Sequence, residues 1–236
     1  MAADGDLQTS IFASTGFPNP TPYAEGSLLE ESILMDYREE QLRNQELVQA
    51  YFSHRGAEEK MLIKGWCRDY IRFREEVAAY QTRYFQSLCN AACYQAQRSA
   101  CCNKDGIITF FADLVVNAIE SDPRELAALM DSLYRSRRDM KCIYLGPEGC
   151  RWRLKPIVCE MFLCDRAQRE IFDASAEAAE IWDGMKKRAL AFRWPDRPVL
   201  FDQIESRFMA AGVSSSLMYL HNSPGLLHVK RKAGRL

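Results

Sequence analysis

Eight of the nine cysteines fall into two compact groups, and thiolate sulfur is a side-chain donor well suited to binding metal ions. The two groups have the spacings Cys89-x3-Cys93-x7-Cys101-Cys102 and Cys142-x7-Cys150-x8-Cys159-x4-Cys164. A tetrahedral site takes four ligands, and soft thiolates favour zinc, iron–sulfur clusters or copper(I). The pattern therefore predicts metal binding, with all eight cysteines as candidate ligands.

Disulfide bonding or simple burial could also account for cysteines in a folded protein. The N-terminus lacks the basic and apolar regions of a signal peptide, which predicts a cytoplasmic protein in which disulfides are disfavoured. A single cysteine is usually a small buried apolar residue, and burial suits Cys67, which lies 22 residues before Cys89. Eight cysteines in two groups favour ligation instead.

Local spacing brings members of each group together. Cys89 and Cys93 are four residues apart at the end of a predicted helix, so both sulfurs would leave the same helical face. In the second group, the turn over residues 146–149 lets the backbone reverse and bring Cys142 and Cys150 together.

The rest of the chain predicts a mainly α-helical protein with a small, irregular, cysteine-rich metal knot that contains short strands. Residues 1–26 are rich in Pro, Gly, Ser and Thr and predict a flexible arm, whereas 27–236 predict one helical domain with the cysteine-cluster region at 89–164. Apolar periodicity and capping signals predict helices over 27–52, 57–88, 109–120, 122–136, 161–192 and 198–211. Two brief strands are expected around Gly146–Gly149, and a turn with one short strand in the C-terminal tail.

Two of these helices have distinct signatures. Asp122-Pro123-Arg124-Glu125 combines an N-cap aspartate, a proline at the first helical position and a glutamate three residues after the cap. The helix over 57–88 carries a stripe with the spacing 4, 3, 4, 3, 4, formed by Trp66, Tyr70, Phe73, Val77, Tyr80 and Tyr84. Such a stripe predicts packing against a partner helix, which could belong to this chain or to a second copy in a homo-oligomer.

Composition and missing motifs narrow the function classes. A formal net charge of −1 provides no basic field for nucleic acid, and no apolar run reaches the roughly 18 residues needed to span a membrane. Phosphate-binding loops, nucleophile elbows and H-E-x-x-H motifs are absent from the sequence. The histidines at 54, 221 and 228 show no ligand spacing, although His221 and His228 could approach the cysteines in space.

The cysteine region has a recognisable order of motifs. The adjacent Cys101-Cys102 pair precedes the apolar run GIITFFADLV, and Gly149-Cys150 and Lys155-Pro156-Ile157-Val158-Cys159 follow later. In this order it resembles the YkgJ-like cysteine-cluster family, a zinc- or iron-chelating domain. The resemblance covers roughly residues 89–164. The chain departs from the family pattern in an opening x3 spacing where the family has x2, in seven residues before the cysteine pair, and in Lys155 where the family usually has Arg.

The resemblance implies chelation of zinc or iron and leaves the role of the metal open. One hypothesis is a structural metal that stabilises the fold. A second is an iron–sulfur oxidoreductase or electron carrier, with a [4Fe-4S] cluster held by four of the cysteines. A third is a protein-modifying enzyme similar to the flagellin lysine methylases, although the sequence contains no further cofactor motif.

Overall fold

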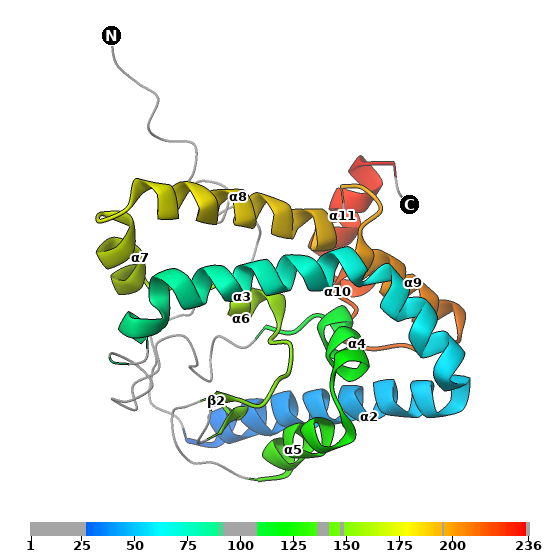
Figure 1. Ribbon diagram of the computed structural model, residues 1–236. Helices are drawn as coiled ribbons and strands as arrows, with labels where there is room; N and C mark the ends of the chain where they lie inside the picture. The colour runs from blue at the N-terminus through cyan, green and yellow to red at the C-terminus, as the bar shows by residue number, and fades with distance from the viewer. Residues whose placement is uncertain are drawn as a thin grey trace.

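The structure, a computed structural model, describes residues 27–89, 91, 108–135, 142–146, 149–194 and 196–234, with side chains from Tyr37 onward. The predicted arm at 1–26 and three candidate ligands, Cys93, Cys101 and Cys102, lie outside these ranges. The mainly helical fold is confirmed (Figure 1). The described helices are α2 (Ser27–Trp66), α3 (Arg68–Cys89), α4 (Phe111–Glu120), α5 (Pro123–Tyr134), α6 (Ile157–Glu160), α7 (Asp165–Phe172), α8 (Ala176–Arg193), α9 (Leu200–Ala210), α10 (Tyr219–Asn222) and α11 (Pro224–Lys232).

Helix α2 bends at Gly56, in the interval that separates two predicted helices. Gly56 has φ 80° and ψ −174°, a backbone conformation that residues with a Cβ atom adopt only at a cost. Two contacts support the bend: the Tyr51 hydroxyl donates to Glu59 Oε1 across it at 2.6 Å, and Arg207 of α9 binds both Glu59 carboxylate oxygens at 2.7 Å. The two arms of α2 are therefore held at a fixed angle against α9.

Two glycines of α2 make a matched test of this bend. Alanine at Gly56 should lower the free energy of unfolding by about 1–2 kcal/mol, because a Cβ atom disfavours positive φ. Alanine at Gly65, whose added Cβ would also meet no atom within 4 Å, should raise it by up to about 1 kcal/mol. Urea unfolding of both variants measures the two changes, and equal effects would contradict this assignment of the bend.

The helix predicted over 57–88 is interrupted at Cys67, between α2 and α3. The Cys67 amide donates to the carbonyls of both Ile63 and Lys64, at 3.1 and 3.2 Å, which tightens the last turn of α2. The prediction of an uninterrupted helix was wrong because Trp66 and Tyr70, the stripe residues on either side of the break, keep the four-residue spacing of a continuous helix. A bifurcated backbone hydrogen bond does not change the spacing of apolar residues, so the sequence pattern could not reveal the break.

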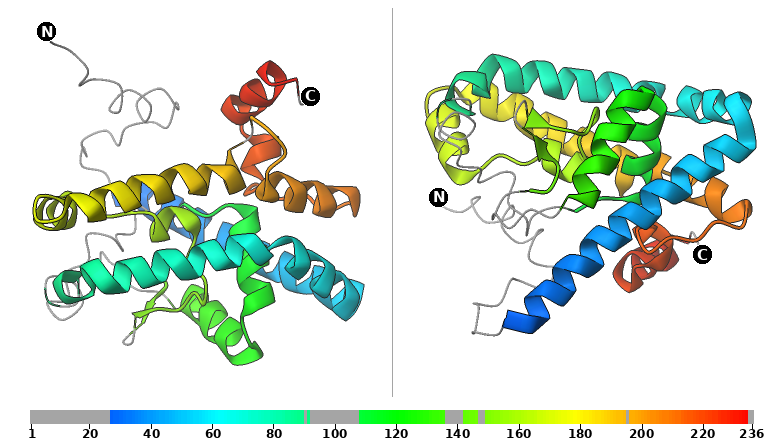
Figure 2. Two further views of the ribbon diagram at one scale, coloured as in Figure 1. Left: turned by 45° about the horizontal axis from the view of Figure 1, so that its top comes forward. Right: turned by 90° about the horizontal axis from the view of Figure 1, so that it is seen from below.

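Helix α3, which carries most of the aromatic stripe, lies alongside α8 of the same chain (Figures 1 and 2). Phe73 stacks on Phe192 with ring centroids 5.3 Å apart, and Tyr80 stacks on Trp182 at 5.4 Å. The Tyr80 hydroxyl also donates to the carbonyl of Ala178 at 2.7 Å. These contacts account for the stripe without a second copy of the chain.

The single helix predicted over 161–192 is instead two helices, α7 and α8, and the short helix α6 ends just before that range at Glu160. Helix α7 starts at Asp165 and ends at Phe172, and Ser175 then begins α8 by accepting a hydrogen bond from the amide of Ala178 at 3.2 Å. The alanine-rich composition favours helix throughout this range, so the sequence analysis did not recognise Ser175 as the N-cap of a separate helix.

The C-terminal tail is also helical, contrary to the predicted turn and strand. Ser223-Pro224-Gly225 suggests a turn, but Pro224 occupies the first position of α11. Proline is favoured there because this position needs no backbone N–H donor.

Helix α4 lies at the centre of the fold, crossed by α2 and in contact with α9 (Figure 2). Residues 111–119 are all buried, including the polar side chains of Asp113 and Asn117. The helix predicted over 109–120 begins slightly later, because Phe110 is the N-cap of α4 and its amide donates to Asp113 at 3.0 Å. The predicted cap of α5 is confirmed, with Asp122 accepting from Arg124 and Glu125.

Candidate metal centre

The segment that carries Cys159 is held by side chains from α3 and α4. On α4, Asn117 accepts from the amide of Leu154 and Asp113 accepts from the amide of Ile157, both at 3.0 Å. On α3, Arg74 donates to the carbonyl of Lys155 at 2.6 Å, and Gln81 donates to the carbonyl of Glu160. The backbone on both sides of Cys159 is therefore fixed at four points.

Arg74 is a deeply buried charge, with its side chain 2% exposed. It donates to the Tyr70 hydroxyl at 2.7 Å and forms an ion pair with the buried carboxylate of Glu160 at 3.5 Å. Lys155 reaches the same Glu160 oxygen at 3.6 Å. A buried guanidinium persists only when it is paired and hydrogen-bonded, and Arg74 meets both conditions.

Asp113 gives this network a pH dependence. Burial raises the pKa of Asp113 from 3.8 to about 6, although hydrogen bonds from Phe110 and Ile157 and the charges of Arg74 and Arg193 lower it. Because the folded protein holds this proton more tightly than the unfolded chain does, the free energy of unfolding should fall as the pH rises from about 4 to about 6. The expected fall is on the order of 2–3 kcal/mol.

Urea unfolding across this pH range, compared with the same series for Asp113→Asn, isolates the contribution. The asparagine amide does not titrate, so the difference between the two proteins should change with pH and level off above about 7. A constant difference would show that Asp113 does not take up this proton.

Three cysteines of the second group, Cys142, Cys150 and Cys159, lie near a buried tyrosine. Leu145–Gly146 (β1) pairs antiparallel with Gly149–Cys150 (β2), and Tyr144 precedes this pair. Burial raises the pKa of the Tyr144 phenol well above its ordinary value, and the negative charges of Cys142, Cys150 and Cys159 raise it further. Three of the candidate ligands thus act electrostatically on one buried hydroxyl.

Tyr144 also connects this hairpin to the part of the chain that follows the first cysteine group. Its hydroxyl donates to Gln41 Oε1 at 3.1 Å, and Gln41 Nε2 donates to Thr109 Oγ1 at 2.7 Å. Thr109 lies seven residues after Cys102 in the sequence. Both ends of the 89–109 segment are consequently placed by described contacts, one by α3 and one by Gln41.

Cys89 and Cys164 lie at the ends of two helices that pack together. Cys89 is the last residue of α3, and Cys164 is the N-cap of α7, which contacts α3. Gln81, which holds the carbonyl next to Cys159, precedes Cys89 by eight residues, or roughly 12 Å along the helix. Within the described ranges, no three Cys, His, Asp or Glu side chains form a group that could hold a metal ion.

Cys67 belongs to the core, as its position inside the helix predicted over 57–88 indicates. It is fully buried, and burial raises the pKa of its thiol to about 12, with a smaller contribution from the charge of Glu120. A thiol that resists ionisation in this way is a poor metal ligand.

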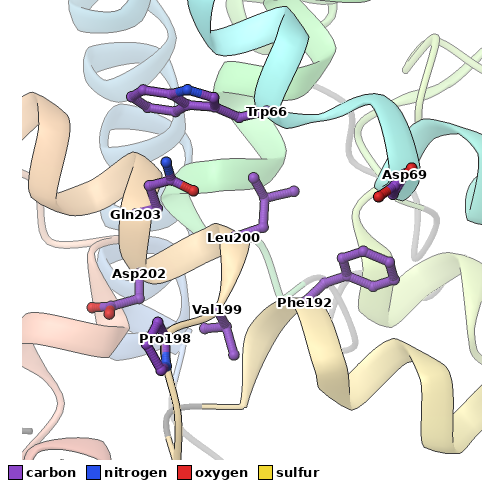
Figure 3. Close-up of a pocket in the computed structure, with 8 residues that line it drawn as sticks. All are labelled: Trp66, Asp69, Phe192, Pro198, Val199, Leu200, Asp202 and Gln203. Atoms are coloured by element: carbon purple, nitrogen blue, oxygen red, sulfur yellow. The ribbon is translucent and has the colours of Figure 1, made fainter.

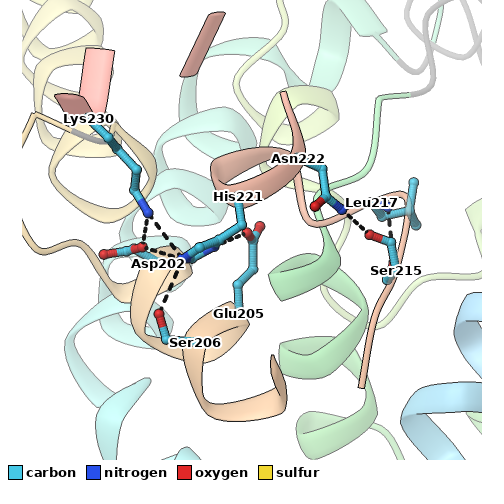
Figure 4. Close-up of polar contacts among 8 residues, drawn as sticks. All are labelled: Asp202, Glu205, Ser206, Ser215, Leu217, His221, Asn222 and Lys230. Carbon is cyan, nitrogen blue, oxygen red and sulfur yellow. Dashed lines mark hydrogen bonds and ion pairs between the residues drawn. The ribbon is translucent and has the colours of Figure 1, made fainter. Parts of the chain in front are cut away.

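His221 has partners of its own in a buried charged cluster formed by α9, α10 and α11 (Figure 4). Its Nδ1 lies 2.8 Å from Glu205 Oε2, and its Nε2 lies 3.2 Å from Asp202 Oδ1 and 3.2 Å from Lys230 Nζ. Lys230 also pairs with Asp202. These contacts attach the two C-terminal helices to α9, which gives His221 a structural role.

Sequence reasoning missed the side chains that hold the Cys159 segment. Asp113 and Asn117 are one helical turn apart in the otherwise apolar FADLVVNAIE, and that placement is a signal for buried polar contacts. Arg74 and Gln81 carry no comparable signal, because polar residues are common on the exposed face of a helix.

Comparison of the chain with protein-family models, curated proteins and solved structures finds no match. The resemblance to the YkgJ-like family stays a prediction that depends on the cysteine motifs. None of the described helices combines the length and apolar character required to cross a bilayer.

Proposed function

We propose that the protein binds zinc or iron through its two four-cysteine groups, in a reducing compartment such as the cytoplasm. The metal would join the 89–102 segment to the 142–164 segment and so stabilise the part of the chain that carries the cysteine groups. Thiolate sites of this kind contribute their binding free energy directly to folding.

The observation that carries the proposal is the fixed backbone around Cys159. Asp113, Asn117, Arg74 and Gln81 each bind a backbone group of residues 154–160. Burying such groups is costly, and a ligand set needs this kind of support to keep its geometry.

Two further observations support a shared centre. Cys142, Cys150 and Cys159 all raise the pKa of the buried Tyr144 phenol, so three cysteines of the second group lie near one residue. Cys89 is the last residue of α3, the helix whose Gln81 side chain holds the carbonyl of Glu160, so the first group starts at the end of that helix.

The serine variants of the cysteines test the proposal. Cys159→Ser and the double variant Cys101→Ser/Cys102→Ser should each lose bound metal during anaerobic purification, because serine is a poor ligand for soft metals. Cys67→Ser should retain it, since Cys67 lies in the core. Metal per folded chain, with folding checked by circular dichroism, is the readout.

Two outcomes would count against the ligand assignment. If Cys67→Ser empties the site while remaining folded, the ligand set is different from the one proposed. If Cys159→Ser keeps the full metal content, the fixed segment serves packing alone.

A further inference from the structure

A second feature of the molecule is an open pocket of about 490 Å³ where the end of α2, the start of α3, the end of α8 and the start of α9 meet (Figure 3). Its volume lies within the range of small-ligand pockets, roughly 300–1,000 Å³. Two aromatic rings, Trp66 and Phe192, and the apolar residues 198–200 line it together with the carboxylates of Asp69 and Asp202. Among the described residues that line the pocket, none carries a positive charge.

The two carboxylates differ in their availability. Asp202 already pairs with Lys230, and His221 Nε2 lies 3.2 Å from its Oδ1, so its charge is balanced within the protein. Asp69 has a side chain that is 83% exposed, and it lies 3.8 Å from Arg72, which is also exposed. The pair is long and exposed, so the Asp69 carboxylate stays accessible and can contribute a modest attraction to a cation in the pocket.

The aromatic rings are fixed and partly accessible. Phe192 stacks on Phe73 at 5.3 Å and meets Tyr70 edge-on at 5.1 Å, and both Trp66 and Phe192 are only half-buried. In Figure 3, Asp69 and Phe192 lie on the same side of the pocket. A cation beside Asp69 could therefore also contact an aromatic face, an interaction that strengthens when the cation is desolvated.

We infer that this pocket binds a small organic cation, an amine or quaternary ammonium group attached to a short apolar body. The charged group would lie beside Asp69 and the aromatic rings, and the apolar body would cover Val199 and Leu200. This inference is independent of the cysteine groups, since none of the described cysteines lines the pocket.

Two organic cations and one neutral molecule test the inference on the full chain. Choline and phenethylammonium are titrated into ¹⁵N-labelled protein, and the indole signal of Trp66 is followed alongside 3,3-dimethylbutan-1-ol, the uncharged isostere of choline. We expect saturable shifts with the cations and a dissociation constant for choline at least about tenfold lower than for the alcohol.

Variants then separate charge from shape. Asp69→Asn should weaken choline binding about twofold to fivefold and leave the alcohol unaffected. Glu177→Gln is the matched control, because Glu177 is an exposed acidic residue in the first turn of α8, as Asp69 is in the first turn of α3. Failure of both cations to bind, equal binding of choline and the alcohol, or an unchanged Asp69→Asn variant would each overturn the inference.

Discussion

Replacing Arg74 with methionine is expected to lower the free energy of unfolding by about 3–5 kcal/mol, the range observed when one partner of a buried ion pair is removed. The variant would leave the Glu160 carboxylate, which is 8% exposed, without its guanidinium and the Lys155 carbonyl without its donor. Lys155 lies 3.6 Å from Glu160 but is itself 44% exposed, so it compensates only in part. Urea unfolding at constant pH gives the value.

Two further variants identify the cause of the loss. Arg72→Met removes an exposed arginine from the same helix and should change stability by less than about 0.5 kcal/mol. Adding Glu160→Gln to Arg74→Met should restore part of the loss, because it removes the unpaired buried charge. A loss below about 1 kcal/mol in Arg74→Met would mean that the guanidinium does not hold the Cys159 segment.

Removing the metal is expected to release the hairpin region while the helical core stays folded. The amides of Leu145 and Arg151, which donate to the carbonyls of Cys142 and Tyr144 at 3.0 and 2.9 Å, should exchange with solvent at least about 100-fold faster after chelation. The stacked helices α3 and α8 make their aromatic contacts without any cysteine, so their amides should keep their protection.

Hydrogen exchange followed by NMR, on metal-loaded and chelated protein, makes this comparison within one molecule. The near-ultraviolet circular dichroism of Tyr144 and Trp152 provides a second readout, because these rings meet edge-on at 5.4 Å. Equal exchange at Leu145 and Arg151 with and without metal would show that the hairpin does not depend on it. If the amides of α3 and α8 lose their protection from exchange to the same extent as Leu145 and Arg151, the metal supports the whole fold.

The sequence predicted most of the helices because their signals are local. The Asp122-Pro123-Arg124-Glu125 motif defines the start of α5 through contacts within four residues, and the aromatic stripe follows the period of α3. The break at Cys67, the cap at Ser175 and the start of α11 at Pro224 were missed. At each of these three positions the local sequence is compatible with more than one structure, and only the folded chain shows where the helix begins or ends.

Of the candidate site, the sequence reveals the cysteines, whose spacing is a local signal, but not the side chains that position them. Cysteine spacing identifies the sulfurs, but the groups that position Cys159 come from α3 and α4, which are 42 to 85 residues away in the sequence. Arg74 is the clearest case: the sequence places it on a charged helix, and only the folded chain buries it beside Glu160. Long-range polar contacts of this kind have no period that a sequence pattern could reveal.

The metal content of the protein, purified without air and measured by elemental analysis, tests the central claim most directly. The proposal predicts either a colourless protein with about one to two zinc atoms per chain, or a brown protein that absorbs near the blue edge of the visible spectrum and contains about four iron atoms for each [4Fe-4S] cluster. Folded protein that contains neither zinc nor iron would contradict it.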